Sequence, residues 1–121
     1  MCNFAPMRRR IIAFGTYYHD FLATLNEAEQ RKVKYIIALL ATEDRMLVKF
    51  IKYLKEYGNL FELRMMYEGN IYRLFVIFDD GCLVVLFHGF QKKTQKTPKK
   101  EIERAIRLRN EYYEQKRTTH L

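Results

Sequence analysis

The spacing of hydrophobic positions changes near residue 60, and this change predicts helices before that point and strands after it. Across residues 17–40, apolar side chains recur every three or four positions, as they do on one face of a helix. Asn26 and Glu29 have the spacing of a capping box, which predicts that a second helix begins there. The β-prone run at residues 10–14 precedes both helices and predicts a first strand.

After residue 60 the apolar positions alternate, which is typical of strands. The alternation predicts strands at residues 60–67, 70–78 and 82–89, joined by two short turns rich in Gly, Asn and Asp. Connections this short require antiparallel neighbours. The strand at residues 70–78 is apolar on both faces except at Arg73, so we expect it at the buried centre of the sheet.

The remaining segments complete an α+β order. Residues 46–57 predict a helical turn that leads into an extended segment, and residues 91–96 form a polar, basic loop. Thr97 is expected to cap a last helix with Pro98 at its first position. The inner stripe of this helix is predicted to be Ile102, Ala105, Ile106 and Tyr113. The predicted order is β-α-α-β-β-β-α, an antiparallel sheet with helices packed on it.

Composition places the chain among small globular proteins. Its 121 residues, 49% of them hydrophobic, suit one domain spanning residues 1–121. No apolar run reaches the roughly 18 residues of a membrane span, and residues 1–10 do not resemble a signal peptide. Cys2 and Cys82 are too few for a disulfide framework, so a cytoplasmic location is expected.

Positive charge is concentrated near the C-terminus. The chain has 22 basic and 14 acidic residues, and residues 87–121 hold ten of the basic and four of the acidic ones. That segment therefore carries a net charge of +6, against +2 for residues 1–86. Such an excess favours a polyanion or an acidic protein as partner, although a solvated basic helix would show the same composition.

Arg73 is the residue with the most chemical information. An arginine in a buried strand must either form an ion pair, for which Glu62 and Asp79 are candidates, or face a functional cavity. Arg64 alternates with apolar residues on the neighbouring strand. Two arginines on one face of a sheet would form a phosphate clamp, because guanidinium groups bind phosphate oxygens in pairs.

A histidine and several lysines surround the end of the last strand. His88 is either structural or an acid–base group, and it precedes Lys92, Lys93 and Lys96 in the basic loop. The histidines are scattered and lack a carboxylate cluster, so we expect no metal and no cofactor. A basic surface of this kind suits a ribonuclease that makes the RNA 2′-hydroxyl attack its own phosphodiester.

The sequence from residue 62 to residue 105 resembles the RelE/ParE superfamily of type II toxin–antitoxin toxins, and most closely its HigB-like, phage-derived branch. The resemblance is carried by ELR at residues 62–64, YR at 72–73, HGFQKKTQKTP at 88–98 and EIERA at 101–105. It implies a RelE-like fold and a ribosome-dependent mRNA endonuclease (an mRNA interferase). It also implies a HigA-like helix-turn-helix antitoxin as the cognate partner, with the ribosome and mRNA as further partners and no membrane association.

The resemblance also implies roles for individual residues. Arg73 matches the sheet arginine that stabilises the scissile phosphate, and Lys92 and Lys93 match a basic position linked to phosphate contact or leaving-group protonation. Arg64 matches a family arginine. Apart from the resemblance, the positive charge of residues 87–121 makes Lys96, Arg104 and Arg107 candidates for contact with RNA phosphates. The candidate catalytic set is therefore Arg73, Lys93, Lys92 and His88.

Two departures from the family pattern leave alternatives open. RelE itself has lysines where this chain has Leu60 and Glu62, and its late tyrosine has no counterpart here. The general base is therefore unassigned, with His88, Tyr67 and Lys96 as candidates. A ParE-like inhibitor of DNA gyrase without catalytic activity is the alternative function, and a catalytically silent RNA-binding module is a third possibility.

Overall fold

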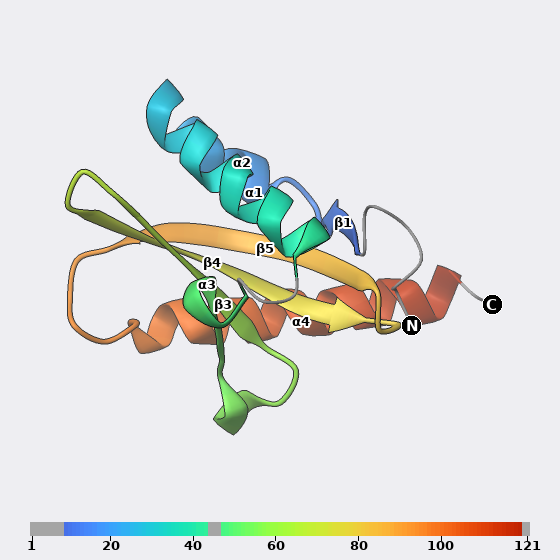
Figure 1. The fold of residues 1–121 in the computed structure, drawn as a ribbon. Coiled ribbons are helices and arrows are strands. Elements are labelled where there is room, and N and C mark those ends of the chain that lie inside the picture. Colours follow the sequence, from blue (N-terminus) through green and yellow to red (C-terminus); the bar gives the residue numbers. More distant parts are fainter. Residues whose placement is uncertain (1–8, 44–46, 120–121) are drawn as a thin grey trace.

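A five-stranded sheet lies at the centre of the fold, and helices cover both of its faces (Figure 1). The computed structural model describes residues 9–43 and 47–119. The elements, in chain order, are β1 (Arg10–Ala13), α1 (Tyr17–Ala23), α2 (Glu27–Thr42), α3 (Leu47–Phe50), β2 (Ile51–Tyr53), the 3-10 turn η1 (Lys55–Tyr57), β3 (Phe61–Tyr67), β4 (Asn70–Asp79), β5 (Leu83–Lys92) and α4 (Lys99–Thr119).

The sheet has the order β1-β5-β4-β3-β2, so β4 is its central strand, as predicted. β3, β4 and β5 are antiparallel neighbours, which the short turns required. The expectation of a wholly antiparallel sheet is wrong, because β1 pairs with β5 in parallel. The long connection between these two strands leaves the direction of β1 unconstrained by any tight turn.

The least regular part of the sequence, residues 46–57, supplies the fifth strand. The helical turn α3 runs directly into β2, which pairs with β3 from Ile51 opposite Leu63 to Tyr53 opposite Phe61. This agrees with the predicted turn and extended segment, although Met46 lies outside the described residues. Because β2 ends its pairing at Leu63, no strand among the described residues pairs with the outer side of the rest of β3.

α1 and α2 cover one face of the sheet. Asn26 and Glu29 form the predicted capping box at the start of α2. Val33, Ile36 and Leu40 of α2 are each about 1% exposed, and they pack with Phe21 of α1 against the apolar residues of the strands. The helical spacing seen in the sequence therefore identified the buried face of α2.

α4 covers the opposite face (Figure 1). Ile102 and Ala105 are buried there as predicted, but Tyr113 is 37% exposed and Leu108 is buried instead. The predicted cap is also off by one residue: α4 begins at Lys99, and the Pro98 carbonyl accepts hydrogen bonds from the backbone of Glu101 and Ile102. Pro98 therefore occupies the cap position rather than the first helical position.

Gly89 marks the place where α1 packs most closely on the sheet. A Cβ atom at this position would lie 2.5–2.7 Å from atoms of the Phe21 ring, which is 5% exposed. We expect Gly89→Ala to lower the free energy of unfolding by about 1–3 kcal/mol, because α1 must shift to relieve the overlap. Urea denaturation checks this, and adding Phe21→Leu should recover part of the loss. Equal losses in the presence and absence of Phe21 would contradict the packing explanation.

Candidate functional site

Arg73 lies on the central strand and is only 5% exposed. Its Nε donates a hydrogen bond to Glu62 Oε1 at 3.1 Å, and its Nη1 donates to the Tyr72 carbonyl at 3.1 Å. Of the two ion-pair partners considered from the sequence, the structure therefore selects Glu62. Asp79 instead accepts hydrogen bonds from Tyr112 and Lys116.

Glu62 is buried beside Arg73 and uses both of its oxygens. Its second oxygen, Oε2, accepts a 2.6 Å hydrogen bond from Thr97 Oγ1, so Thr97 holds this carboxylate instead of capping α4. Burial lowers the pKa of the Arg73 guanidinium, and the negative charge of Glu62 opposes that shift. An arginine keeps its charge under these conditions. Glu62 and Thr97 therefore fix one edge of a desolvated guanidinium.

Two further cations share this end of the sheet with Arg73. Arg64 is the direct cross-strand partner of Arg73, so the two side chains project from the same face. Lys92 lies two residues beyond Phe90, the partner of Arg73 on β5, and therefore on that face as well. Burial lowers the pKa of the Lys92 ammonium, and the charges of Arg73 and then Arg64 lower it further. The structure thus brings three of the predicted site residues together.

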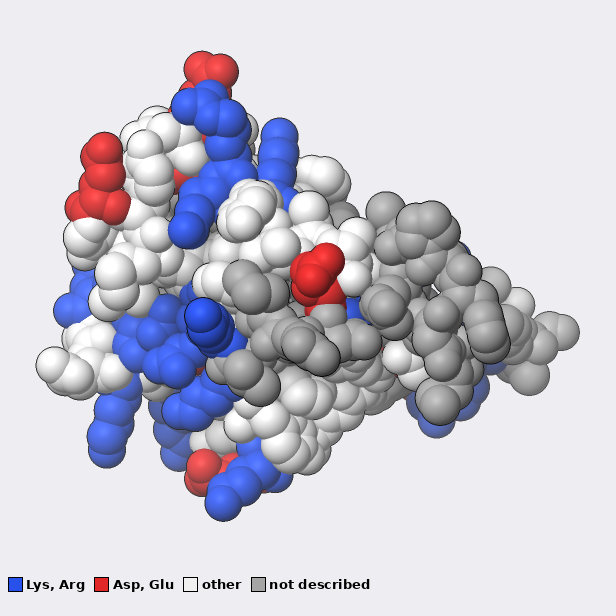
Figure 2. Space-filling model, in the orientation of Figure 1, with Lys and Arg blue, Asp and Glu red and all other residues white. Residues whose placement is uncertain are grey.

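Two surface hollows adjoin this cluster on either side of Ile71. The first, of about 290 Å³, lies along the part of β3 that β2 does not pair; its lining includes Arg64, Arg73, Lys32 and Lys49. The second, of about 420 Å³, is lined by Ile71, Lys92, Lys93, Thr94 and Gln95. Figure 2 shows Lys and Arg side chains gathered at this part of the surface, near α3.

Lys93 and Lys96 follow β5 on the exposed basic loop. Lys93 lines the second hollow together with Lys92. Lys96 is exposed, and its carbonyl accepts a 2.7 Å hydrogen bond from Thr94 Oγ1, which fixes a tight bend in this loop. The loop therefore presents Lys93 beside the cluster, whereas Lys96 is absent from the lining of both hollows.

His88 has surroundings unlike those expected for an accessible acid–base group. It is 2% exposed, packs against Phe75, and its Nε2 lies 3.0 Å from Glu101 Oε1 at the start of α4. Its Nδ1 is buried, with no hydrogen-bond partner among the described residues. Burial, followed by the charge of Arg104, lowers the pKa of His88 to about 4. The geometry makes His88 a neutral residue that fastens α4 to the sheet.

The buried, neutral His88 should make stability depend on mild acidity. In the folded protein it protonates near pH 4, whereas in the unfolded chain it protonates near its ordinary pKa of about 6.5. Between these values only the unfolded chain gains the proton, so stability falls as pH falls. Between pH 6.5 and 5 we expect a loss of about 2 kcal/mol. Glu101, Arg104 and Arg107 are the charged groups that contribute to the shift.

Urea denaturation at pH 7, 6 and 5 measures this effect, because most carboxyl groups titrate below that range. His88→Gln is the control, since it keeps a side-chain amide that can reach Glu101 but does not titrate. The variant should have nearly constant stability across this range. A variant that loses as much stability as the natural protein would show that His88 is not the responsible group.

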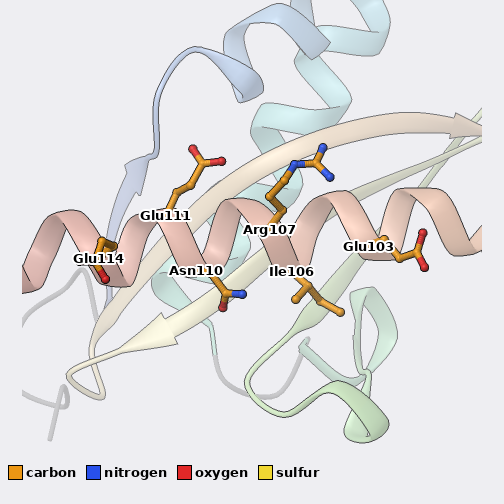
Figure 3. Close-up of a pocket in the computed structure, with 6 residues that line it drawn as sticks. All are labelled: Glu103, Ile106, Arg107, Asn110, Glu111 and Glu114. Carbon is orange, nitrogen blue, oxygen red and sulfur yellow. The ribbon is translucent and has the colours of Figure 1, made fainter.

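The arginines of α4 lie apart from the Arg73 cluster. The Arg104 guanidinium lies 5.5 Å from the centre of the Tyr17 ring, and Arg109 donates hydrogen bonds to the carbonyls of Tyr57 and Asn59. Arg107 lies on the outer side of α4 in a shallow hollow whose lining includes three glutamates (Figure 3). Among the described residues, Arg107 is therefore the arginine of α4 for which no hydrogen bond, ion pair or ring contact is seen. The hollow that it lines is largely acidic.

Three residues near the cluster were not assigned to the site from the sequence. Thr97 was interpreted as a helix cap, and Lys32 and Lys49 were not distinguished from other surface lysines. Lys32 comes from α2 and Lys49 from α3, yet both line the hollow beside Arg73. No spacing pattern links positions so far apart along the chain. Their proximity arises because α2 and α3 pack on the same edge of β3.

The described residues form neither a metal centre nor a membrane-spanning helix. Within residues 9–43 and 47–119, no group of three or more His, Cys, Asp or Glu side chains is arranged to hold a metal ion. In the same part of the chain, no helix has the length and apolar character needed to cross a membrane.

Comparisons with known proteins identify the family. Residues 20–110 match the family described as "Phage derived protein Gp49-like (DUF891)". Among solved structures, the chain is similar to a chain of the archaeal RelE–RelB complex from Pyrococcus horikoshii OT3, with 17% identity and a TM-score of 0.49 over 74% of this chain and 98% of that one. No curated protein matches the chain significantly. Because the family match covers most of the chain, this protein belongs to the phage-derived Gp49-like family, a family of RelE-like toxins.

Proposed function

We propose that this toxin is a ribosome-dependent mRNA endonuclease of the HigB type, and that its active surface is centred on Arg73. The observation that carries the proposal is the placement of a charged, desolvated guanidinium beside Arg64 and Lys92 at one end of the sheet. A fixed cation in a site largely removed from water stabilises developing negative charge far better than a mobile, hydrated one.

The proposed reaction is attack of an RNA 2′-hydroxyl on the adjacent phosphodiester. The hydroxyl loses its proton, the new O–P bond forms a 2′,3′-cyclic phosphate, and the bond to the 5′-oxygen breaks. Arg73 stabilises the charge on the non-bridging oxygens, with Arg64 as the second arm of the clamp. Lys92, whose lowered pKa makes it a better proton donor, protonates the departing 5′-oxygen, and Lys93 contacts the phosphate.

The roles of the other predicted residues follow from their positions. His88 is assigned to the positioning of α4, because it contacts Glu101 and, unlike Arg73, lines neither hollow. Tyr67, at the end of β3, and Lys96, in the basic loop, are the two partly or fully exposed candidates for the base that accepts the 2′-hydroxyl proton. Arg104 and Arg107 contribute to phosphate contact with the ribosome or mRNA through the positive field of residues 87–121.

The proposed partner is a HigA-like helix-turn-helix antitoxin. A toxin of the Gp49-like family requires inhibition in the cell that makes it, and a net charge of +8 favours association with an acidic protein. The antitoxin can inhibit either by covering Arg73 and Lys93 or by making the toxin too bulky for the ribosomal A site. Hydrogen exchange of residues 92–96 in the complex distinguishes these modes, since only covering protects the loop.

Cleavage mapping in a reconstituted translation reaction tests the proposed function. Purified protein is added to an mRNA with and without translating ribosomes, and the new 5′ ends are mapped by primer extension. We expect discrete cuts that require ribosomes and leave 2′,3′-cyclic phosphate ends. An intact mRNA together with inhibited DNA supercoiling by gyrase would overturn the proposal in favour of the ParE-like alternative.

A further inference from the structure

The hollow beside Arg73 combines positive charge with an apolar lining. Lys32, Lys49 and Arg64 contribute the cations around Arg73, and no Asp or Glu is among its lining residues. The remaining lining is apolar: Ile36, Phe50, Met65, Met66 and Ile71. The hollow on α4 in Figure 3 differs in that three glutamates contribute to its lining, which would repel a polyanion.

The chemistry of this lining fits one nucleotide of a single strand. A nucleotide has an anionic phosphate and a flat, largely apolar base, and sites for single strands pair cations with apolar or aromatic platforms. The half-buried Phe50 packs against the core, whereas Met66 is 62% exposed at the edge of β3. A hollow of about 290 Å³ has room for one nucleotide.

The second hollow could hold the next nucleotide of the same RNA strand. Ile71 lines both hollows, and it is the register partner of Met66 on one side and Lys92 on the other. In an RNA strand whose phosphate contacts Arg73, the nucleotide on one side of that phosphate would lie beside Met66. The nucleotide on the other side would lie beside Lys92 and Lys93. We infer that the hollow between Phe50, Met66 and Ile71 is a nucleobase subsite for the nucleotide next to the scissile phosphate. This inference rests on the proposed function, since it takes RNA as the ligand.

Binding of short RNA oligomers tests the subsite apart from cleavage. The probe is a fluorescent single-stranded RNA pentamer that carries 2′-O-methyl groups and so cannot be cut; a second pentamer lacks the central base but keeps every phosphate. We expect the natural protein to bind the complete oligomer about tenfold more tightly than the abasic one. Met66→Ala and Phe50→Leu should each remove most of this difference, because they reduce the apolar lining while leaving the cations in place.

Matched variants separate the base contact from charge and from general loss of structure. Tyr35→Ala removes an exposed apolar side chain of α2 that lines neither hollow, and it should leave both affinities unchanged. Lys49→Gln should weaken binding of both oligomers by a similar factor. Thermal unfolding of Met66→Ala should match that of the natural protein, because Met66 is exposed.

The outcomes also distinguish this inference from the proposed function. If the protein cuts no mRNA but binds the complete oligomer more tightly than the abasic one, and this difference requires Met66, the subsite is supported and the proposed endonuclease activity is overturned. Cleavage of mRNA with no effect of Met66→Ala or Phe50→Leu on either oligomer would overturn the subsite alone. The inference would be overturned if Met66→Ala bound RNA as tightly as the natural protein but bound an acidic peptide more weakly than the natural protein does. That result would assign the hollow to a protein partner.

Discussion

Arg73→Ala is expected to abolish growth arrest and to slow mRNA cleavage by about 100- to 1,000-fold. Removing one fixed cation from a desolvated transition-state site raises the barrier by about 3–4 kcal/mol. Arg73→Lys should recover little of the lost activity, because an ammonium group lacks the paired donors that a guanidinium directs at phosphate oxygens. The rate of cleavage on translating ribosomes measures both effects.

Two controls keep this result interpretable. Lys34→Ala removes an exposed positive charge from α2 that lines neither hollow, so it should leave the cleavage rate close to that of the natural protein. Circular dichroism and thermal unfolding establish that Arg73→Ala is still folded. Undiminished toxicity of a well-expressed Arg73→Ala protein would remove Arg73 from the proposed mechanism.

Glu62→Ala is expected to lower the free energy of unfolding by about 3–5 kcal/mol, because it leaves the Arg73 guanidinium buried without its counter-charge. The same change deprives Thr97 Oγ1 of its acceptor. Glu62→Gln should cost less, since its amide oxygen still accepts one hydrogen bond. Urea denaturation at pH 7 provides the values.

A double variant tests whether the loss of stability in Glu62→Ala arises because the Arg73 charge is left buried without a partner. With Arg73→Met in place, the buried cation is gone, so adding Glu62→Ala should destabilise far less than Glu62→Ala does in the natural protein. Additive losses in the double variant would show that the two side chains act independently. Thr97→Val should be milder than either single change at Glu62, because it removes only one neutral donor.

Features set by neighbouring residues were visible in the sequence. The capping box of Asn26 and Glu29 depends on a three-residue spacing, and the β3–β4–β5 meander depends on turns too short for any other geometry. The parallel direction of β1 was not visible, because nothing close to it in sequence limits how it joins the sheet. Leu108 was missed on the buried face of α4 because the predicted stripe ran from Ile106 to Tyr113, whereas the buried face continues from Ala105 to Leu108, three residues further on.

The same distinction between contacts local in sequence and contacts distant in sequence applies to the candidate site. Arg73 and Arg64 could be grouped from the sequence, since alternation and strand pairing place them on one face of adjacent strands. Lys92 was predicted in the basic loop, whereas β5 extends to Lys92 and places it on that face as well. The contact of Thr97 with Glu62 joins a loop to a strand 35 residues away, and no local pattern encodes it. The burial of His88 depended on where α4 would lie, which the spacing of apolar residues in β5 alone does not determine.

The position of β1 has a consequence for the order of folding. Its partner residues, from Arg10 opposite Leu83 onward, are more than seventy positions apart in the chain, whereas β3, β4 and β5 pair across turns of a few residues. Closing so long a loop before other contacts form is entropically costly, so we expect the meander to form early and β1 to join it late. Changes in β1 should therefore accelerate unfolding while leaving the folding rate almost constant, and changes in the meander should slow folding itself.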